Sequence, residues 1–156
     1  MTDMPPRLFI DDTLTAGRAL ALPERAARHV QVLRLQPGAA VTLFDGRGGQ
    51  WSARIEAMGA RAVTVQVLEH EAIERELTLH VTLALAMPAG DRMDVVVEKA
   101  TELGAAAIVP LLSERSVLRL AGERASKRAA HWQAIATAAC EQCGRNRLPT
   151  VAAPQS

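Results

Sequence analysis

The chain has 156 residues, 49% of them hydrophobic and 22% charged, which allows one ordinary domain or two small ones and excludes extensive disorder. No apolar run approaches the roughly 20 residues of a membrane span, no signal pattern opens the chain, and two cysteines exclude a disulfide scaffold, so we expect a cytoplasmic protein with no membrane partner. The formal net charge of +1 neither demands nor excludes a nucleic-acid partner.

Short strands and one helix are predicted for residues 1–72. Short strands are expected at Arg7–Ile10, Ala19–Leu22 and Val41–Asp45. Apolar–polar alternation indicates two further, half-buried strands at Trp51–Ile55 and Ala62–Leu68. Pro23 suits the first turn of a helix, which we expect over Glu24–Leu35. Asp45–Gly49 is typical of a hairpin loop because its glycines tolerate positive φ. This half is expected to form a small β-barrel.

Longer elements alternate in residues 73–156, after a Glu-rich linker expected at Glu69–Glu76. In chain order we expect strand, helix, strand, helix and strand at Leu77–Met87, Asp91–Leu103, Ala105–Leu112, Gly122–Cys143 and Leu148–Ala152. Asp91 is a suitable N-cap, and Gly104 and Gly144 are expected to end the two helices. This order implies a parallel sheet with right-handed crossovers. The predicted fold class is therefore α+β with two domains, a β-barrel followed by an α/β domain.

The predicted parallel sheet looks unfinished. Three strands and two helices form only part of an open sheet, and parallel sheets need cover on both faces. The sequence stops in Ala153–Ser156, just after the third strand begins. We therefore expect either that something else covers the exposed sheet or that a C-terminal portion is missing.

Basic residues gather in two segments. Seven basic residues lie between Arg115 and Arg147 against two acidic ones, a local balance of +5. The second segment contains Arg25, Arg28, His29 and Arg34 beside a single glutamate, Glu24. Guanidinium groups suit forked contacts with phosphate, but two solvated helix faces explain the same pattern equally well.

The strand ends of the second half supply candidate site residues. Arg92 opens a helix that follows the carboxyl end of a parallel strand, where open α/β sheets bind ligands. Ser113–Arg115 follows the next strand and is expected at the same edge, and Glu141–Arg147 leads into the third strand. Helix capping and surface pairing remain alternatives for each of them.

Two other patterns are weaker signals. Cys140 and Cys143 share a helix face, but a structural zinc needs four ligands and no second cysteine pair exists, so small buried side chains are the preferred interpretation and no metal is expected. Glu98 and Glu102 have the spacing of an acid/base pair, for which a solvated face with Lys99 as local partner is the preferred alternative.

Six segments stand in a characteristic order and spacing: His29–Arg34, Phe44–Gly46, Gly90–Asp94, Glu98–Gly104, Pro110–Ser116 and Ala139–Arg147. Together they resemble the RsmE-type methyltransferases, which methylate N3 of a uridine in bacterial 16S ribosomal RNA. The resemblance implies a PUA-like RNA-binding barrel over residues 1–72 and the first part of a SPOUT-type methyltransferase domain over residues 73–156. In this family the C-terminal segment of the second domain is tied in a trefoil knot.

The resemblance also implies S-adenosylmethionine as cofactor, 16S ribosomal RNA or the small ribosomal subunit as partner, and a homodimer. The family holds its cofactor with a Gly-Pro-Glu-Gly-Gly segment and a later knot segment, both expected beyond Ser156. No cofactor-binding residue is therefore assigned, and the chain is interpreted as a truncated member. A non-catalytic RNA-binding or ribosome-assembly module is the alternative function.

Residue roles follow from the resemblance as hypotheses. Loss of the uridine N3 proton leaves negative charge on O2 and O4, which Arg92 or Arg115 would stabilise, with a general base near Glu141. The candidate RNA-binding residues are Arg7, Arg28, His29, Arg34, Arg145 and Arg147.

Overall fold

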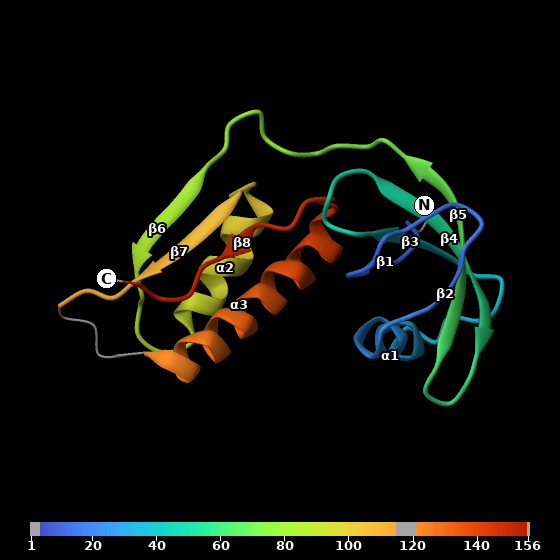
Figure 1. The fold of residues 1–156 in the computed structure, drawn as a ribbon, viewed down its shortest axis with the longest axis horizontal. Helices are drawn as coiled ribbons and strands as arrows, with labels where there is room; N and C mark the ends of the chain where they lie inside the picture. The colour runs from blue at the N-terminus through green and yellow to red at the C-terminus, as the bar shows by residue number, and fades with distance from the viewer. Residues whose placement is uncertain (1–3, 115–120, 156) are drawn as a thin grey trace. The chain divides into compact units, whose positions relative to one another are not determined.

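The computed structural model describes residues 4–114 and 121–155, and the chain divides into two compact units, Met1–Arg75 and Glu76–Ser156 (Figure 1). The strand that ends the first unit runs through Glu71, into the segment expected as a linker. Gln50 pairs with Glu71 and Trp51 with His70, so ladder pairing overrides the low strand propensity of these polar residues.

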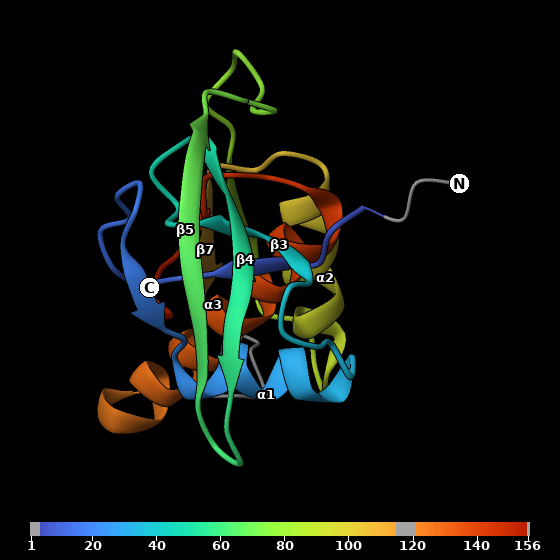
Figure 2. The ribbon, with the colours of Figure 1, turned by 90° about the vertical axis from the view of Figure 1, so that its right-hand side faces the viewer.

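The first unit is a five-stranded sheet with one helix. Its elements are β1 (Arg7–Phe9), β2 (Ala19–Ala21), α1 (Glu24–Val32), β3 (Ala40–Phe44), β4 (Gln50–Met58) and β5 (Val63–Glu71). The strand order is β1-β3-β4-β5-β2, in which β1 and β3 are parallel and the other neighbours antiparallel. Figure 2 shows β4 and β5 as a long hairpin. A β-rich first half with a single helix is therefore confirmed.

Alternation along the strands builds the core of this unit. Val63, Val65 and Val67 of β5 are buried, while Thr64 and Gln66 between them are only half-buried. The buried positions of α1, including Val30, join the same hydrophobic cluster. The inner face of the sheet and one face of α1 thus share a core.

The helix α1 ends earlier than predicted. Leu33 is its C-cap and Arg34 has a φ of 54°, a left-handed conformation that is uncommon outside glycine. The helix therefore ends at Val32, three residues before the predicted end at Leu35, and no glycine marks the turn at Arg34.

The second unit is a three-stranded parallel sheet with two helices. Its elements are β6 (Thr82–Ala86), α2 (Arg92–Glu102), β7 (Ala107–Leu111), α3 (Gly122–Cys143) and β8 (Thr150–Val151). The strand order is β6-β7-β8 and both pairs are parallel, as predicted. Gly104 and Gly144, with φ of 96° and 90°, follow α2 and α3 in the predicted left-handed conformation.

One predicted feature of this unit is wrong, and another is confirmed in position only. The first strand begins at Thr82 and not at Leu77, because its pairing with β7 starts only at Thr82 and Ala107. Leu77 and Leu79 are consequently 53% and 73% exposed. Asp91 occupies the N-cap position of α2, but its side chain makes no capping hydrogen bond.

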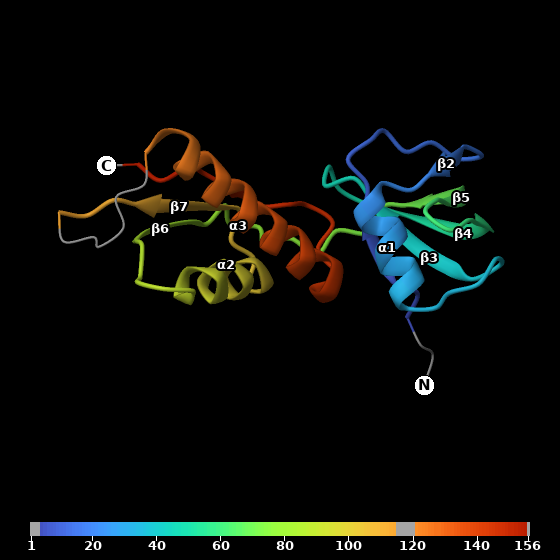
Figure 3. The same ribbon diagram turned by 90° about the horizontal axis from the view of Figure 1, so that it is seen from below.

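The two faces of this sheet differ sharply. Leu83 and Leu85 of β6 pack against a cluster that holds Met93 of α2 and Trp132 of α3, so both helices cover one face (Figure 3). Thr82, Ala84 and Ala86 alternate with those leucines and are exposed. Within residues 76–114 and 121–155 the opposite face has no covering layer, as the sequence led us to expect.

Candidate functional site

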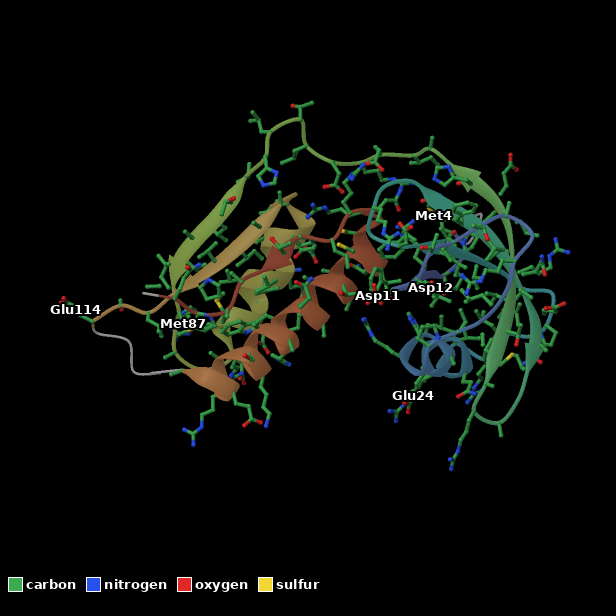
Figure 4. The ribbon with its side chains drawn as sticks, in the orientation of Figure 1. Met4, Asp11, Asp12, Glu24, Met87 and Glu114 are labelled. Carbon is green, nitrogen blue, oxygen red and sulfur yellow. The ribbon has the colours of Figure 1, made fainter. Side chains whose placement is uncertain are left out.

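The carboxyl ends of the three strands meet at one edge of the sheet, called here the carboxyl edge. The Met87 amide donates to the Leu111 carbonyl at 3.1 Å, and the Leu112 amide donates to the Gln155 carbonyl at 2.8 Å. Arg92 follows β6 at this edge, and Ser113 and Glu114 follow β7. The predicted proximity of the two strand ends is therefore confirmed. Figure 4 shows Met87 and Glu114 at this edge.

Arg92 is available to a ligand. It is the first residue of α2 and is exposed. No residue in the described ranges forms a hydrogen bond or ion pair with its guanidinium. Gly90, two residues earlier, has a φ of 68° and open space where a Cβ would lie, so the turn between β6 and α2 is unobstructed. Arg115, the other candidate for charge stabilisation, lies outside the described residues.

Glu141 lies at the opposite, amino edge of the sheet. Arg145 follows Glu141 in the chain by four residues. Its guanidinium donates to the carbonyls of Thr101 and Ala105 at 2.8 and 2.9 Å, just where α2 ends. Because α2 rises about 15 Å from Arg92 to Glu102, the structure does not bring Glu141 together with Arg92. The sequence showed only that Glu141 precedes β8. A residue that precedes a parallel strand lies toward the amino end of that strand.

Arg145 has internal partners in place of the expected RNA. Its side chain is 6% exposed, and Nη2 lies 2.5 Å from Oε2 of Glu76. With the two carbonyl contacts, this occupies the guanidinium and gives Arg145 a structural role. Arg147 is exposed and lines a cavity of about 510 Å³ at the amino edge, together with His80 and Thr150.

The candidate RNA-binding residues of the first unit lie in two places. Arg28 is exposed on α1 and lines an open depression of about 620 Å³ with Gln31 and Arg61. His29 is half-buried on the same helix, and Arg34 is exposed just beyond its end. Sequence reasoning missed Arg61 because it stands alone in the β4–β5 turn, where no spacing pattern identifies it.

Arg7 lies on β1 and is held within the fold. Its Nη1 donates to Oε1 of Gln50 at 2.7 Å, and its Cζ lies 4.8 Å from the centre of the Phe44 ring. The half-buried guanidinium therefore has internal contacts that would compete with phosphate.

The carboxylates of α2 are neutralised locally. Lys99 Nζ lies 2.7 Å from Oε1 of Glu98 and 2.9 Å from Oε1 of Glu102. Hydrogen bonding to Lys99 lowers the pKa of Glu98, and both glutamates raise the pKa of Lys99. The interpretation of Lys99 as a local partner is thus confirmed. Both glutamates line a groove of about 360 Å³ with Ile135.

The cysteines are free thiols. Cys140 is buried, and its Sγ donates to the Arg147 carbonyl at 3.6 Å, while Cys143 is half-buried. In the part of the chain that the structure describes, no three His, Cys, Asp or Glu side chains gather closely enough to hold a metal ion. No described helix is long and apolar enough to cross a membrane.

A further pair escaped sequence analysis. Asp94 of α2 accepts a hydrogen bond from Nε1 of Trp132 at 3.1 Å and lies 2.9 Å from Nε2 of His131. His131 and Trp132 stand 37 and 38 residues after Asp94 in the sequence, so no local pattern joins them to it.

The chain is similar to RNA methyltransferases in both units. Residues 75–156 match the RNA methyltransferase domain family, and residues 22–68 match the RNA methyltransferase PUA domain. Ribosomal RNA small subunit methyltransferase E of Synechocystis is 42% identical over 80% of this chain and 39% of that protein. The Bacillus subtilis protein of the same name is 33% identical over 78% of this chain and 48% of that protein.

Solved structures agree along nearly the whole chain. Ribosomal RNA small subunit methyltransferase E from Neisseria gonorrhoeae, bound to S-adenosyl methionine, has a TM-score of 0.93 and 40% identity over 97% of this chain and 63% of that one. A putative methyltransferase from Legionella pneumophila, in complex with the same cofactor, has a TM-score of 0.93 and 34% identity over 99% of this chain and 64% of that one. The chain thus spans between 39% and 64% of the length of these four proteins.

Proposed function

The chain belongs to the ribosomal RNA small subunit methyltransferase E (RsmE) family, and from this premise we propose that the protein methylates N3 of a uridine in 16S ribosomal RNA, with S-adenosylmethionine as methyl donor. The observation that carries the proposal is the TM-score of 0.93, over 97% of this chain, with a family member bound to S-adenosyl methionine. The methyl donor supplies an electrophilic carbon on a sulfonium. The protein must therefore orient the uridine and manage the charge that develops on it.

Arg92 is the proposed charge-stabilising residue. Removal of the N3 proton leaves an anion that is shared between O2 and O4 of uracil. A guanidinium offers several N–H donors in one plane, which suits two acceptors on one ring edge. The exposed position of Arg92 at the carboxyl edge, without an internal partner in the described residues, supports this role.

The general base is proposed at the same edge. A base must come within hydrogen-bond reach of the proton that it removes. Asp91 and Glu114 are exposed carboxylates; Asp91 directly precedes Arg92, and Glu114 follows β7, the parallel neighbour of β6, whereas Asp94 already accepts from Trp132. We therefore assign the candidate role to Asp91 or Glu114 in place of Glu141.

We assign no cofactor pocket to the described residues of this edge. Neither Arg92 nor Ser113 lines any of the three cavities at Arg28, His80 and Glu98. We propose that the cofactor site needs residues of the kind that relatives carry outside the matched region, since this chain spans 63% of the S-adenosyl methionine-bound structure. The part proposed for this chain's own residues is to orient the uridine and to balance its charge.

The remaining partners are proposals of the same kind. Arg28 and Arg34 are proposed to bind ribosomal RNA, with Arg7, His29 and Arg147 as further candidates; the exposure of Arg28, Arg34 and Arg147 supports this. A homodimer is proposed from the family. Analytical ultracentrifugation tests it, and a monomer at micromolar concentration would overturn it for this chain.

The test of the proposed function uses unmethylated small ribosomal subunits. This chain, and in parallel a protein extended to the length of its relatives, is incubated with methyl-labelled S-adenosylmethionine, and the digested RNA is searched for labelled nucleosides. We expect 3-methyluridine from the extended protein. Label on another atom would refute the N3 assignment. Binding of RNA by both proteins without S-adenosylmethionine binding, measured by calorimetry, would instead support the non-catalytic RNA-binding module.

A further inference from the structure

Four basic side chains form a stripe on the amino-terminal half of α3. The members of this α3 stripe are Arg124, Lys127, Arg128 and His131. At about 100° per residue they fall within an arc of about 100°, and they rise about 10 Å along the helix. The Lys127 side chain is 74% exposed and that of His131 is 49% exposed. Arg124 is also exposed and Arg128 is half-buried, so three of the four side chains face solvent along one line and the fourth is partly covered.

Little within the fold neutralises the stripe. Lys127 Nζ lies 2.6 Å from Oε1 of Glu123, but both side chains are more than 70% exposed, and such pairs contribute little to stability. No hydrogen bond or ion pair links Arg124 or Arg128 to another residue in the described ranges. Three permanent cations, Arg124, Lys127 and Arg128, against Glu123 leave a local excess of two positive charges.

His131 is held in place at one end of the stripe. Its Nε2 lies 2.9 Å from Oδ2 of Asp94, and Oδ1 of the same carboxylate accepts from Nε1 of Trp132, which is 3% exposed. The buried indole fixes the carboxylate, and the carboxylate fixes the imidazole. Nδ1 is consequently the ring nitrogen that remains to meet a ligand.

The stripe lies at the carboxyl edge of the sheet. Asp94 belongs to the first turn of α2, which follows β6, so its bond to His131 brings the middle of α3 to the helix start that carries Arg92. Figures 1 and 3 both show the amino-terminal half of α3 beside the ends of β6 and β7. An RNA strand that contacts Arg92 can therefore also contact the α3 stripe.

We propose that the α3 stripe binds backbone phosphates of the ribosomal RNA substrate next to the target uridine. The inference rests on the proposed function and adds a substrate-binding surface to its second unit. A linear row of guanidinium and ammonium groups matches a linear row of phosphates, and arginine forms forked contacts with each. Such contacts fix the position of a strand and do not read its bases.

The test compares two charge-matched triple variants of the 156-residue chain. The first carries Arg124→Ser, Lys127→Ser and Arg128→Ser. The control carries Arg18→Ser, Arg54→Ser and Lys99→Ser, which removes the same charge from exposed positions outside the stripe. Binding to a fluorescent 16S ribosomal RNA fragment is measured by anisotropy over a series of salt concentrations. A third variant with Arg124→Lys and Arg128→Lys keeps the charge.

For the stripe variant we expect affinity to fall at least about tenfold and the log–log salt slope to shrink by about 2, because each single-strand phosphate contact contributes about 0.7. The control should lose less than about threefold, and the lysine variant should keep the full slope. Circular dichroism confirms that all three are folded. Equal losses in the stripe variant and the control would overturn the proposal, as would unchanged RNA affinity together with lost binding to polyglutamate, which would indicate an acidic protein partner. If the unmodified chain does not bind RNA, both this inference and the RNA-binding part of the proposed function are refuted. If the unmodified chain binds RNA and the stripe variant loses no more affinity than the control, only this inference is refuted.

Discussion

Arg145 and Glu76 form an ion pair that joins two segments 69 residues apart, the first residue of the second unit and the loop before β8. The same guanidinium donates to the carbonyls of Thr101 and Ala105, at the end of α2. The Thr101 carbonyl also accepts from the Gly104 amide at 3.1 Å, so Arg145 adds a second donor there and supplies a charged donor to the Ala105 carbonyl just beyond the helix. One side chain thereby holds three segments together.

Replacing Arg145 with methionine should destabilise the second unit by about 3 kcal/mol, because it leaves the Glu76 carboxylate without its main partner. Urea unfolding followed by Trp132 fluorescence, with Trp51→Phe as background, isolates this unit. The matched control is Arg147→Met, an exposed neighbour whose replacement should change stability by less than about 0.5 kcal/mol. Equal effects of the two substitutions would contradict the structural role.

Asp94 and Asp91 should respond differently to alanine. Asp94→Ala removes the acceptor of a buried indole N–H and should cost about 1–3 kcal/mol, with a red shift of Trp132 emission. Asp91→Ala should stay within about 0.5 kcal/mol, because the Asp91 side chain makes no capping hydrogen bond. A large effect of Asp91→Ala would show that it caps α2 in solution.

The pKa of Asp12 offers a pH-dependent check on the first unit. A hydrogen bond from Arg18 and another from the Thr13 amide hold the pKa of Asp12 below its ordinary value. A carboxyl whose pKa is lower in the folded state stabilises the fold above its unfolded pKa, and this contribution disappears as the pH falls through the folded value. Arg18→Ala should therefore raise the pKa of Asp12, measured by carboxyl-carbon NMR titration. An unchanged titration would mean that the ion pair does not persist in solution.

Substitutions of Arg92 and Glu141 should have different effects on methyl transfer, measured with the protein extended to the length of its relatives. Arg92→Ala should lower kcat by about 10²-fold or more if it stabilises the uridine anion. Glu141→Ala should leave kcat within about threefold, because Glu141 lies at the amino edge, and its effect is measured in the same assay. The reverse ranking would restore Glu141 as the general base and remove Arg92 from its charge-stabilising role.

The sequence predicted elements best where local chemistry marks both ends. The helix Gly122–Cys143 was predicted with its observed bounds, because a glycine stands at its first residue, Gly122, and Gly144 adopts a left-handed conformation after it. The strand before α2 was predicted too long, because Leu77 to Val81 are as apolar as a strand but find no paired neighbour. Strand pairing is a non-local property, so a single-strand pattern does not reveal where it starts.

Charge patterns predicted where site residues stand in the chain, but not which of them face solvent. Arg145 and Arg147 look alike in sequence, but Arg145 is buried, with Glu76 and two carbonyls as partners, whereas Arg147 is exposed. Arg92 was found from its place after a strand, a rule that depends on parallel topology and not on distant partners. By the same rule Glu141, which precedes a strand, is not expected at the carboxyl edge.

The left-handed backbone of Arg34 lowers local stability, while its side chain is a candidate for RNA binding. A side chain at this φ costs about 1 kcal/mol, which glycine would avoid. The arginine that carries this cost presents a cation to solvent beside α1. Selection for a more heat-resistant protein would therefore favour a residue that lacks the charge, and the two demands would pull this position in opposite directions.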